Sequence, residues 1–160
     1  MYKRQHWDNL QEAAAKPGPS GHTMLDGPTA AAELDKTAAN KALMQSYMDD
    51  LLQGRREKFT GYFDGGNYIQ HSPLVADNLT GLFAGLQALA KEGKAVKYDK
   101  VHKVLGEGNF VLVVAEGSFG GKPASYYDFY RIANSKIAEH WDTIELIPPR
   151  DAWKNANGKF

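Results

Sequence analysis

The segment Lys136-Ile137-Ala138-Glu139-His140-Trp141-Asp142 decides the fold and carries the most informative titratable groups of the chain. We predict that it belongs to a β-strand, the last of the chain, which follows a short turn segment at residues 133–136. Successive side chains of a strand point to opposite faces, so His140 and Asp142 share one face while Trp141 takes the other. The segment therefore predicts a strand that presents two titratable groups to one side and an indole to the other.

Four strand-like stretches follow one another in the second half of the chain. They span residues 96–105, 110–119, 124–132 and 137–147. The joints between them are short and contain glycine or asparagine, residues that suit tight hairpin turns. We therefore predict an antiparallel meander that ends with the opening segment.

Helical periodicity dominates the chain before these strands. Apolar residues recur at three- and four-residue spacing, and glycines are placed to end each run. The expected elements are a helix over 35–53, a short helix over 55–63, a short strand over 68–72 and a helix over 77–93. Helices separated in sequence from one antiparallel sheet are typical of an α+β layer fold.

Composition limits the classes of partner. The 160 residues are 42% hydrophobic, which suits one compact domain. Nineteen Lys and Arg residues balance nineteen Asp and Glu residues, so nucleic acid is not an expected partner. There is no cysteine, and no apolar run approaches the ~20 residues of a membrane span. We expect no membrane partner, and the cytoplasm is the default compartment.

The N-terminal region repeats the opening motif. His6-Trp7-Asp8 has the same letters as His140-Trp141-Asp142, about one domain length earlier. Residues 1–33 are otherwise rich in glycine and proline, which is typical of a tail or linker. We interpret the repeat as the end of a preceding copy of the domain, with a relic strand that has no sheet to join; chance similarity is the alternative. The expected organisation is a tail or linker over 1–33, a domain over 34–149 and a tail over 150–160.

Four phrases of the sequence resemble the SnoaL-like branch of the nuclear-transport-factor-2-like superfamily. They are Tyr68-Ile69-Gln70-His71-Ser72-Pro73, Gly106-Glu107-Gly108-Asn109-Phe110-Val111, Tyr127-Asp128-Phe129-Tyr130-Arg131 and Lys136-Ile137-Ala138-Glu139-His140-Trp141-Asp142. The resemblance implies a cone of three N-terminal helices against a curved antiparallel sheet whose concave face lines a pocket. It also implies a homodimer through the outer face of the sheet, where this fold commonly pairs with a second copy.

The resemblance brings a range of activities with it. The branch includes polyketide cyclases that perform intramolecular aldol chemistry. The wider fold includes ketosteroid isomerases, dehydratases, an epoxide hydrolase and non-catalytic binding domains, so the fold alone does not give the activity. In the cyclases an acid/base aspartate lies on a late strand, and Asp142 matches it by position in the motif.

Four titratable residues are expected to converge in the pocket, namely Asp142, His140, His71 and Asp128. An aspartate in an apolar cone has its pKa raised towards neutrality and acts as a general base or acid, while histidine or tyrosine binds the developing enolate. We expect Asp142 to be the base and the other three to orient it, with no cofactor and no metal. The expected contacts to a small-molecule ligand are Tyr47, Tyr68, Trp141 and Tyr130.

Each candidate also has a purely structural interpretation. His140 would be a buried histidine that donates to Asp128 or a carbonyl, Asp142 a partner of Arg131 or Lys136, and His71 a residue that fixes the strand end; Tyr47 and Trp141 would belong to the core or a dimer surface.

Departures from known relatives narrow the chemistry. Ketosteroid isomerases carry an acidic base just before the proline of the short strand, whereas Ser72 precedes Pro73 here. The epoxide hydrolases need an arginine and an aspartate two apart on a middle strand, and residues 110–119 contain neither. No short metal-ligand motif such as His-x-x-x-His is present. The sequence favours acid/base catalysis on a small apolar carbonyl compound, of the aldol/cyclase or isomerase type, with a non-catalytic binding or dimerisation domain as the alternative.

Overall fold

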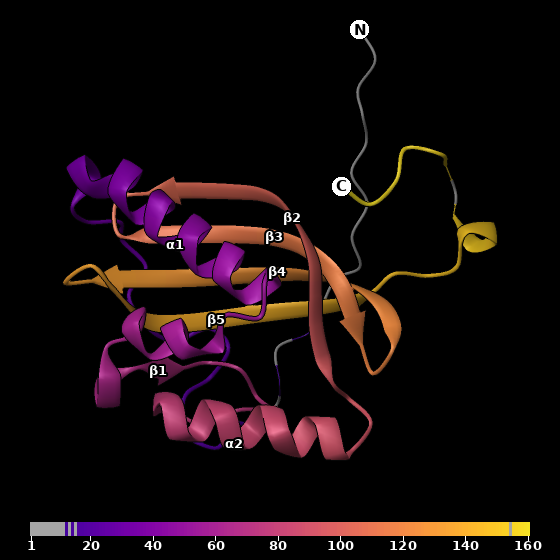
Figure 1. Cartoon of the computed structure of the whole chain (residues 1–160), viewed down its shortest axis with the longest axis horizontal. Coiled ribbons are helices and arrows are strands. Elements are labelled where there is room, and N and C mark those ends of the chain that lie inside the picture. The colour runs from indigo at the N-terminus through magenta and orange to yellow at the C-terminus, as the bar shows by residue number, and fades with distance from the viewer. Residues whose placement is uncertain (1–11, 13, 15, 154) are drawn as a thin grey trace, which may run out of the picture.

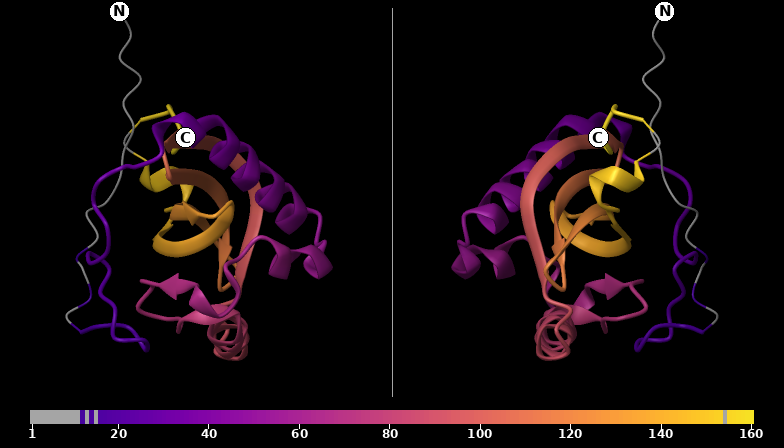
Figure 2. Two further views of the ribbon diagram at one scale, coloured as in Figure 1. Left: turned by 90° about the vertical axis from the view of Figure 1, so that its left-hand side faces the viewer. Right: turned by 90° about the vertical axis from the view of Figure 1, so that its right-hand side faces the viewer.

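The computed structural model describes residues 12, 14, 16–153 and 155–160 of the chain. The relic strand expected at His6-Trp7-Asp8 lies outside these residues. One curved sheet forms the centre of the molecule, with α1 (Thr37–Leu52) across one face and α2 (Asn78–Lys91) along its β1 side (Figure 1). The N-terminal segment runs on the opposite side of the sheet from α1 (Figure 2).

The sheet has five strands, in the order β1-β5-β4-β3-β2. Their bounds are β1 (Ile69–Gln70), β2 (Val96–Glu107), β3 (Phe110–Phe119), β4 (Lys122–Ala133) and β5 (Lys136–Leu146). The last four pair as antiparallel neighbours, which confirms the predicted meander, and β1 adds to β5 in parallel. Asn134 and Ser135 have φ of 51° and 58°, the left-handed conformation that a two-residue turn between β4 and β5 requires.

The helical part differs from the expectation of three N-terminal helices. The described residues contain two α-helices and four short 3₁₀ helices: η1 (Leu34–Lys36), η2 (Arg56–Gly61), η3 (Gly65–Asn67) and η4 (Arg150–Ala152). The second expected helix is η2, which lies between Gly54 and Gly61 and has only six residues. A segment this short forms few α-helical hydrogen bonds, so the tighter 3₁₀ turn is the usual result. Within the described residues, no helix combines the length and the apolar character needed to cross a membrane.

The core lies between α1 and the concave face of the sheet, which we call the inner face. On α1 the buried side chains include Met44, Tyr47 and Met48, at the three- and four-residue spacing of one helix face. They meet fully buried strand residues such as Val111 and Val113. Each such apolar side chain contributes about 1.5–3 kcal/mol on burial. This packing holds the inner face of the sheet at a fixed position relative to α1.

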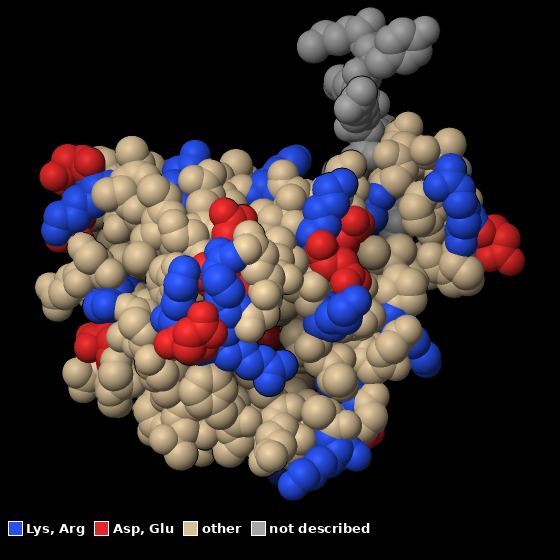
Figure 3. Space-filling model, viewed as in Figure 1, with Lys and Arg blue, Asp and Glu red and all other residues tan. Residues whose placement is uncertain are grey.

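Charged side chains of both signs are interspersed over the face seen in Figure 3. This distribution agrees with the equal numbers of basic and acidic residues in the chain. A narrow hollow lies near the centre of this face, just above α2 (Figure 3).

Candidate functional site

The pairing of β4 with β5 gathers the titratable candidates on the inner face. Asp128 lies opposite Asp142, and Tyr130 lies opposite His140. Directly paired residues of antiparallel strands project to the same face of a sheet. Tyr130 also packs edge-to-face on Tyr47 of α1, with ring centroids 6.2 Å apart. The face shared by His140, Asp128 and Asp142 is therefore the one that α1 covers, as strand alternation predicted.

His140 links β5 to β4 and β1 through both ring nitrogens. Its Nε2 lies 3.2 Å from Oδ1 of Asp128, and its Nδ1 lies 3.1 Å from Oε1 of Gln70. The same Gln70 oxygen accepts the backbone N–H of Ser72 at 3.1 Å, while Nε2 of Gln70 donates to the Tyr68 hydroxyl at 3.0 Å. The Gln70 amide is thus fixed with its oxygen towards His140, so His140 Nδ1 carries a proton. His140 Nε2 faces the Asp128 carboxylate, so the imidazole and the carboxyl group form a close polar pair.

Asp128 is almost completely enclosed and receives a second donor from β2. Its side chain is 1% exposed, and the Tyr98 hydroxyl lies 3.1 Å from each of its carboxylate oxygens. Hydrogen bonds to a charged acceptor are about twice as strong as neutral ones. Asp128 is therefore held by Tyr98 and His140 together, which suits a carboxylate that orients other groups.

Tyrosine hydroxyls surround these carboxyl groups. Burial and the charge of Asp128 raise the pKa of Tyr47, and burial raises the pKa of Tyr126 to about 12. The pKa values of Tyr68, Tyr98 and Tyr130 are raised well above their ordinary range, again chiefly by burial. All five remain neutral hydroxyl groups at physiological pH. Tyr98 donates to Asp128 and Tyr126 donates to the carbonyl oxygen of Ser118. The hydroxyl groups of Tyr47, Tyr68 and Tyr130 are the candidate O–H donors to an oxygen bound on the inner face.

Asp142 is the second carboxyl group of the inner face, and it is held less firmly than Asp128. Burial raises its pKa, with a smaller contribution from the charge of Asp128; His140 and a hydrogen bond from Ser72 act in the opposite direction. The expected ion pair with Arg131 does not form, because Nε of Arg131 binds Glu139 at 2.5 Å. A carboxyl group with a raised pKa is the form that exchanges protons near neutral pH.

Two of the expected site residues lie on the other face of the sheet, which we call the outer face. Nε2 of His71 lies 2.8 Å from Oε1 of Glu139, and its ring stacks on Trp141 with centroids 4.3 Å apart. The expectation that His71 converges with the inner-face group is therefore corrected. Alternation along the short strand turns Tyr68 and Gln70 inwards, and the residue next to Gln70 must point the other way. Trp141 takes the outer face by the same rule.

The three tyrosines expected as ligand contacts all lie in the inner layer. Tyr47 is 8% exposed and packs edge-on against Tyr62 and Phe63, so it also belongs to the core. Tyr130 stacks on His140 with ring centroids 4.6 Å apart. They can contact a ligand only through their edges and hydroxyl groups.

Sequence reasoning missed three members of the group: Tyr98, Gln70 and Ser72. For Gln70 and Ser72 the signal was present, because both alternate in register with Tyr68. Tyr98 was hidden, since β2 pairs with β3 through irregularities between Tyr98 and Lys100 and again further along the strand. Simple alternation does not place a residue beside a bulge.

A shallow hollow opens on the outer face. It has a volume of ≈ 270 Å³ and is lined by Met24, Leu25, Leu112, Tyr127, Phe129, Trp141, Asp142 and Thr143. Asp142 borders this hollow between two outward-facing neighbours, whereas its charge acts on the buried tyrosines of the inner face. The hollow is mostly apolar, and Asp142 is the residue that it shares with the inner-face group.

Comparison with known proteins finds solved structures with a similar architecture. No protein-family model and no curated protein sequence matches the chain. Among solved structures, a candidate ketosteroid isomerase from Kribbella flavida is similar at 18% identity and a TM-score of 0.53, over 76% of this chain and 92% of that one. Bal32a, from a soil-derived mobile gene cassette, matches at 16% identity and a TM-score of 0.53, over 68% and 91%.

A third structure carries the fold name itself. An NTF2-like protein of unknown function from Cytophaga hutchinsonii is 17% identical with a TM-score of 0.53, and the match covers 74% of this chain and 95% of that one. Identities this low are informative about the fold and not about the activity. The chain therefore has the nuclear-transport-factor-2-like α+β fold.

Proposed function

We propose that the chain is a SnoaL-like acid/base catalyst that acts on a small apolar compound carrying a carbonyl group. The observation that carries the proposal is Asp142, whose pKa is raised by burial on a face lined with neutral tyrosine hydroxyls. Perturbed carboxyl groups in enclosed sites are the usual candidates for proton transfer. The reaction type is an aldol-type cyclisation or an isomerisation, and it uses neither cofactor nor metal on the inner face.

In this mechanism Asp142 is the base. Its carboxylate removes a proton from the carbon next to the substrate carbonyl, and the electron pair moves to the carbonyl oxygen to form an enolate. The hydroxyl groups of Tyr47 and Tyr130 donate to that oxygen. Return of the proton from Asp142 to another carbon gives isomerisation. Alternatively, the enolate carbon attacks a second carbonyl, which forms a carbon–carbon bond and an alkoxide, and the alkoxide takes the proton from Asp142 to give the aldol product. General acid/base catalysis of this kind contributes about 10²–10⁴-fold.

His140 and Asp128 have a supporting role in the proposal. The contact between them, together with the Tyr98 hydroxyl bonds to Asp128, holds an imidazole and a carboxyl group beside Asp142. The charge of Asp128 raises the pKa of Asp142, and that of His140 lowers it. This pair would therefore set how readily Asp142 accepts a proton.

The likeness to a candidate ketosteroid isomerase supports the fold of such a pocket, but steroid isomerisation itself is disfavoured. The residue before Pro73 is Ser72, which cannot act as the carboxylate base at that place. Ser72 instead donates a hydrogen bond to Asp142. The substrate class is therefore better sought among smaller carbonyl compounds that undergo aldol, retro-aldol or isomerisation reactions.

A substrate panel with matched variants tests the proposal. Aldol, retro-aldol and isomerisation substrates are compared for the wild type, Asp142→Asn and Asp99→Asn. The control Asp99 is an exposed β2 carboxylate paired with Lys97. We expect Asp142→Asn to lower kcat by about 100-fold and Asp99→Asn to leave it unchanged. An active wild type whose rate survives Asp142→Asn would remove Asp142 from its role.

A second candidate, a non-catalytic binding or dimerisation domain, is favoured by the outer face. Leu105 and Phe129 are 51% and 37% exposed there, and they lie near the apolar hollow. A second copy covering these side chains would make the homodimer through the sheet expected for this fold. Analytical ultracentrifugation tests this candidate: a dimer that Phe129→Glu dissociates supports it, and a strict monomer opposes it.

A further inference from the structure

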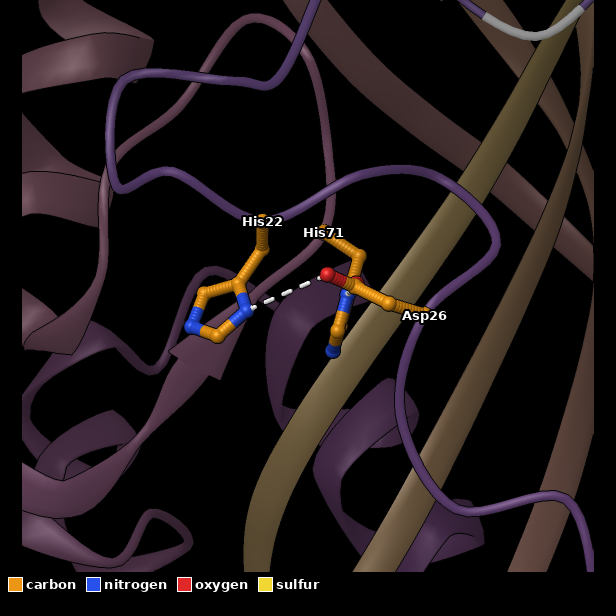
Figure 4. Close-up of side chains that lie close together, drawn as sticks. All are labelled: His22, Asp26 and His71. Atoms are coloured by element: carbon orange, nitrogen blue, oxygen red, sulfur yellow. Dashed lines mark hydrogen bonds and ion pairs between the residues drawn. The ribbon is translucent and has the colours of Figure 1, made fainter.

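A second group of titratable side chains lies on the outer face, where the N-terminal segment meets β1 and β5. Figure 4 shows His22 and Asp26 from that segment facing His71 from the end of β1. One ligand-type atom from each of the three lies within 4.8 Å of the others. Oδ1 of Asp26 also accepts a hydrogen bond from the Thr23 backbone N–H at 3.1 Å, which holds the carboxylate in place.

The environment of His71 requires a cation at this point. The side chain is 1% exposed, and Nε2 lies 2.8 Å from Oε1 of Glu139. Glu139 is also bound by Arg131, so it is a carboxylate that accepts a hydrogen bond from the Nε2–H of His71. Nδ1 of His71 then faces two further acceptors, Oδ1 of Asp26 at 2.7 Å and the carbonyl oxygen of Thr23 at 3.0 Å. Three lone pairs meet there, and only a proton or a metal ion can bring them together.

The second imidazole is arranged in the same way. His22 Nδ1 lies 3.7 Å from Oδ2 of Asp26, and its Nε2 lies 3.7 Å from Oδ2 of Asp77. Each histidine therefore directs one nitrogen towards Asp26 and the other towards a separate carboxylate. This is the second-shell pattern of metal-binding histidines, in which a carboxylate on the far nitrogen fixes the tautomer and the ring orientation.

We propose that His22, Asp26 and His71 bind a divalent transition-metal ion of the zinc class, with the Thr23 carbonyl or a water molecule as the fourth ligand. Imidazole and carboxylate are the ligand types that zinc accepts, at metal–ligand distances of about 2.0–2.2 Å. Tetrahedral bonds of that length separate the ligand atoms by about 3.4 Å. The present separations need only small side-chain movements to reach this value. The site is independent of the inner-face chemistry and uses a different set of residues.

The other histidines of the described sheet do not take part in the proposed site. His140 and Asp128 belong to the inner face, and the ring of His102 stacks on Phe160 at 3.9 Å. The ligands His22 and Asp26 come from the part of the chain expected to be a linker. A bound ion would fasten that segment to the sheet.

Other contacts position the same segment for this purpose. Nε1 of Trp141 donates to the carbonyl oxygen of Asp26 at 3.0 Å, and the Ser20 hydroxyl accepts the backbone N–H of Asp77 at 2.6 Å. Gly27 has φ of 108°, and a Cβ there would lie 2.6 Å from the Trp141 ring. The segment is therefore held with its ligands in place before any ion binds, which lowers the cost of ordering them.

The test uses the full chain, with any affinity tag removed. Zn²⁺ is titrated calorimetrically into the wild type, His22→Ala, Asp26→Ala and the matched control His102→Ala. His22 is 34% exposed at its side chain, so its replacement leaves the fold intact. We expect one tight equivalent of Zn²⁺ in the wild type and in His102→Ala, and an affinity at least about tenfold weaker in the other two variants. Visible absorption with Co²⁺ in place of Zn²⁺ should show a ligand-field band that His22→Ala loses.

Two results would overturn the proposal. One is a wild type that binds no tight equivalent of Zn²⁺ or Co²⁺, which would show that a proton alone holds the three groups together. The other is binding that falls equally in His22→Ala and His102→Ala, which would show non-specific capture by imidazole.

Discussion

The two faces of β5 each hold a buried histidine between oxygen atoms, but the two histidines serve different environments. On the inner face His140 lies between Asp128 and Gln70. On the outer face His71 lies between Glu139 and Asp26. Both histidines contact a carboxylate through a ring nitrogen. A histidine–carboxylate pair therefore does not by itself identify the reactive face.

The two faces differ in the surroundings of a second carboxyl group, which is Glu139 on the outer face and Asp142 on the inner face. The outer carboxylate Glu139 is bound by His71 and Arg131 together, and its charge is therefore balanced. On the inner face, burial raises the pKa of Asp142 and only a hydrogen bond from Ser72 and the charge of His140 oppose it. Proton transfer needs a group whose protonation can change at working pH. The comparison therefore supports the proposal that proton transfer takes place on the inner face. The outer-face residues instead hold the N-terminal segment against the sheet.

Replacing the buried inner-face histidine and the partly exposed histidine of the N-terminal segment should give the largest contrast. His140→Ala leaves Asp128 buried without its partner, and breaking such a pair lowers the free energy of unfolding by about 3 kcal/mol or more. His22→Ala, on the exposed outer segment, should change it by about 0.5 kcal/mol or less in metal-free buffer. Urea denaturation of both variants measures the difference. Equal losses would mean that the inner pair carries no special share of the stability.

Asp142→Asn and Asp26→Asn should change stability in opposite directions. The native pKa of Asp142 is raised above its ordinary value of 3.8, so the native state binds more protons than the unfolded state and loses stability as pH rises through that window. Asp142→Asn should therefore be more stable than the wild type at pH 7, by about 1.4 kcal/mol for each unit of the shift, with the difference vanishing well below pH 3.8.

Asp26 provides the opposite case. Its pKa is lowered, so its contribution is present above its ordinary pKa of 3.8 and is lost as pH falls through the lower native value. Asp26→Asn should therefore be less stable than the wild type at pH 7, by a small amount because the group is exposed. Thermal unfolding at several pH values measures the stability of both variants. If both substitutions changed the stability at pH 7 in the same direction, the distinction between the two faces would be lost.

Much of this fold follows from local pattern. Residues 110–119 begin with an apolar, valine-rich run between glycine-containing turns and form β3 over the same residues, and turn residues such as Asn134 and Ser135 lie where the hairpins need positive φ. The second helix was less predictable, because helical periodicity over 55–63 does not distinguish an α-helix from a 3₁₀ turn. The docking of residues 16–28 on the outer face depends on contacts with β1 and β5 that are distant in sequence.

The candidate site was predictable to the extent that alternation applies. His140, Asp142 and Asp128 converge because β4 and β5 pair without a bulge up to Arg131. His71 was assigned to the inner face because histidine is a common catalytic residue. Alternation predicts the outer face instead, since His71 directly follows the inward-facing Gln70. The metal-type cluster could not be read from sequence, since 48 residues separate His22 from the end of β1 and no short motif joins them.

The titration of Asp142 tests the central claim most directly. Carbon-13 NMR of the side-chain carboxyl groups, assigned by the signal that Asp142→Asn lacks, follows this residue through pH. The account predicts a pKa clearly above the ordinary value of 3.8, because burial and the charge of Asp128 both raise it. A carboxyl that titrates at or below 3.8 would contradict the account and leave Asp142 as a structural residue.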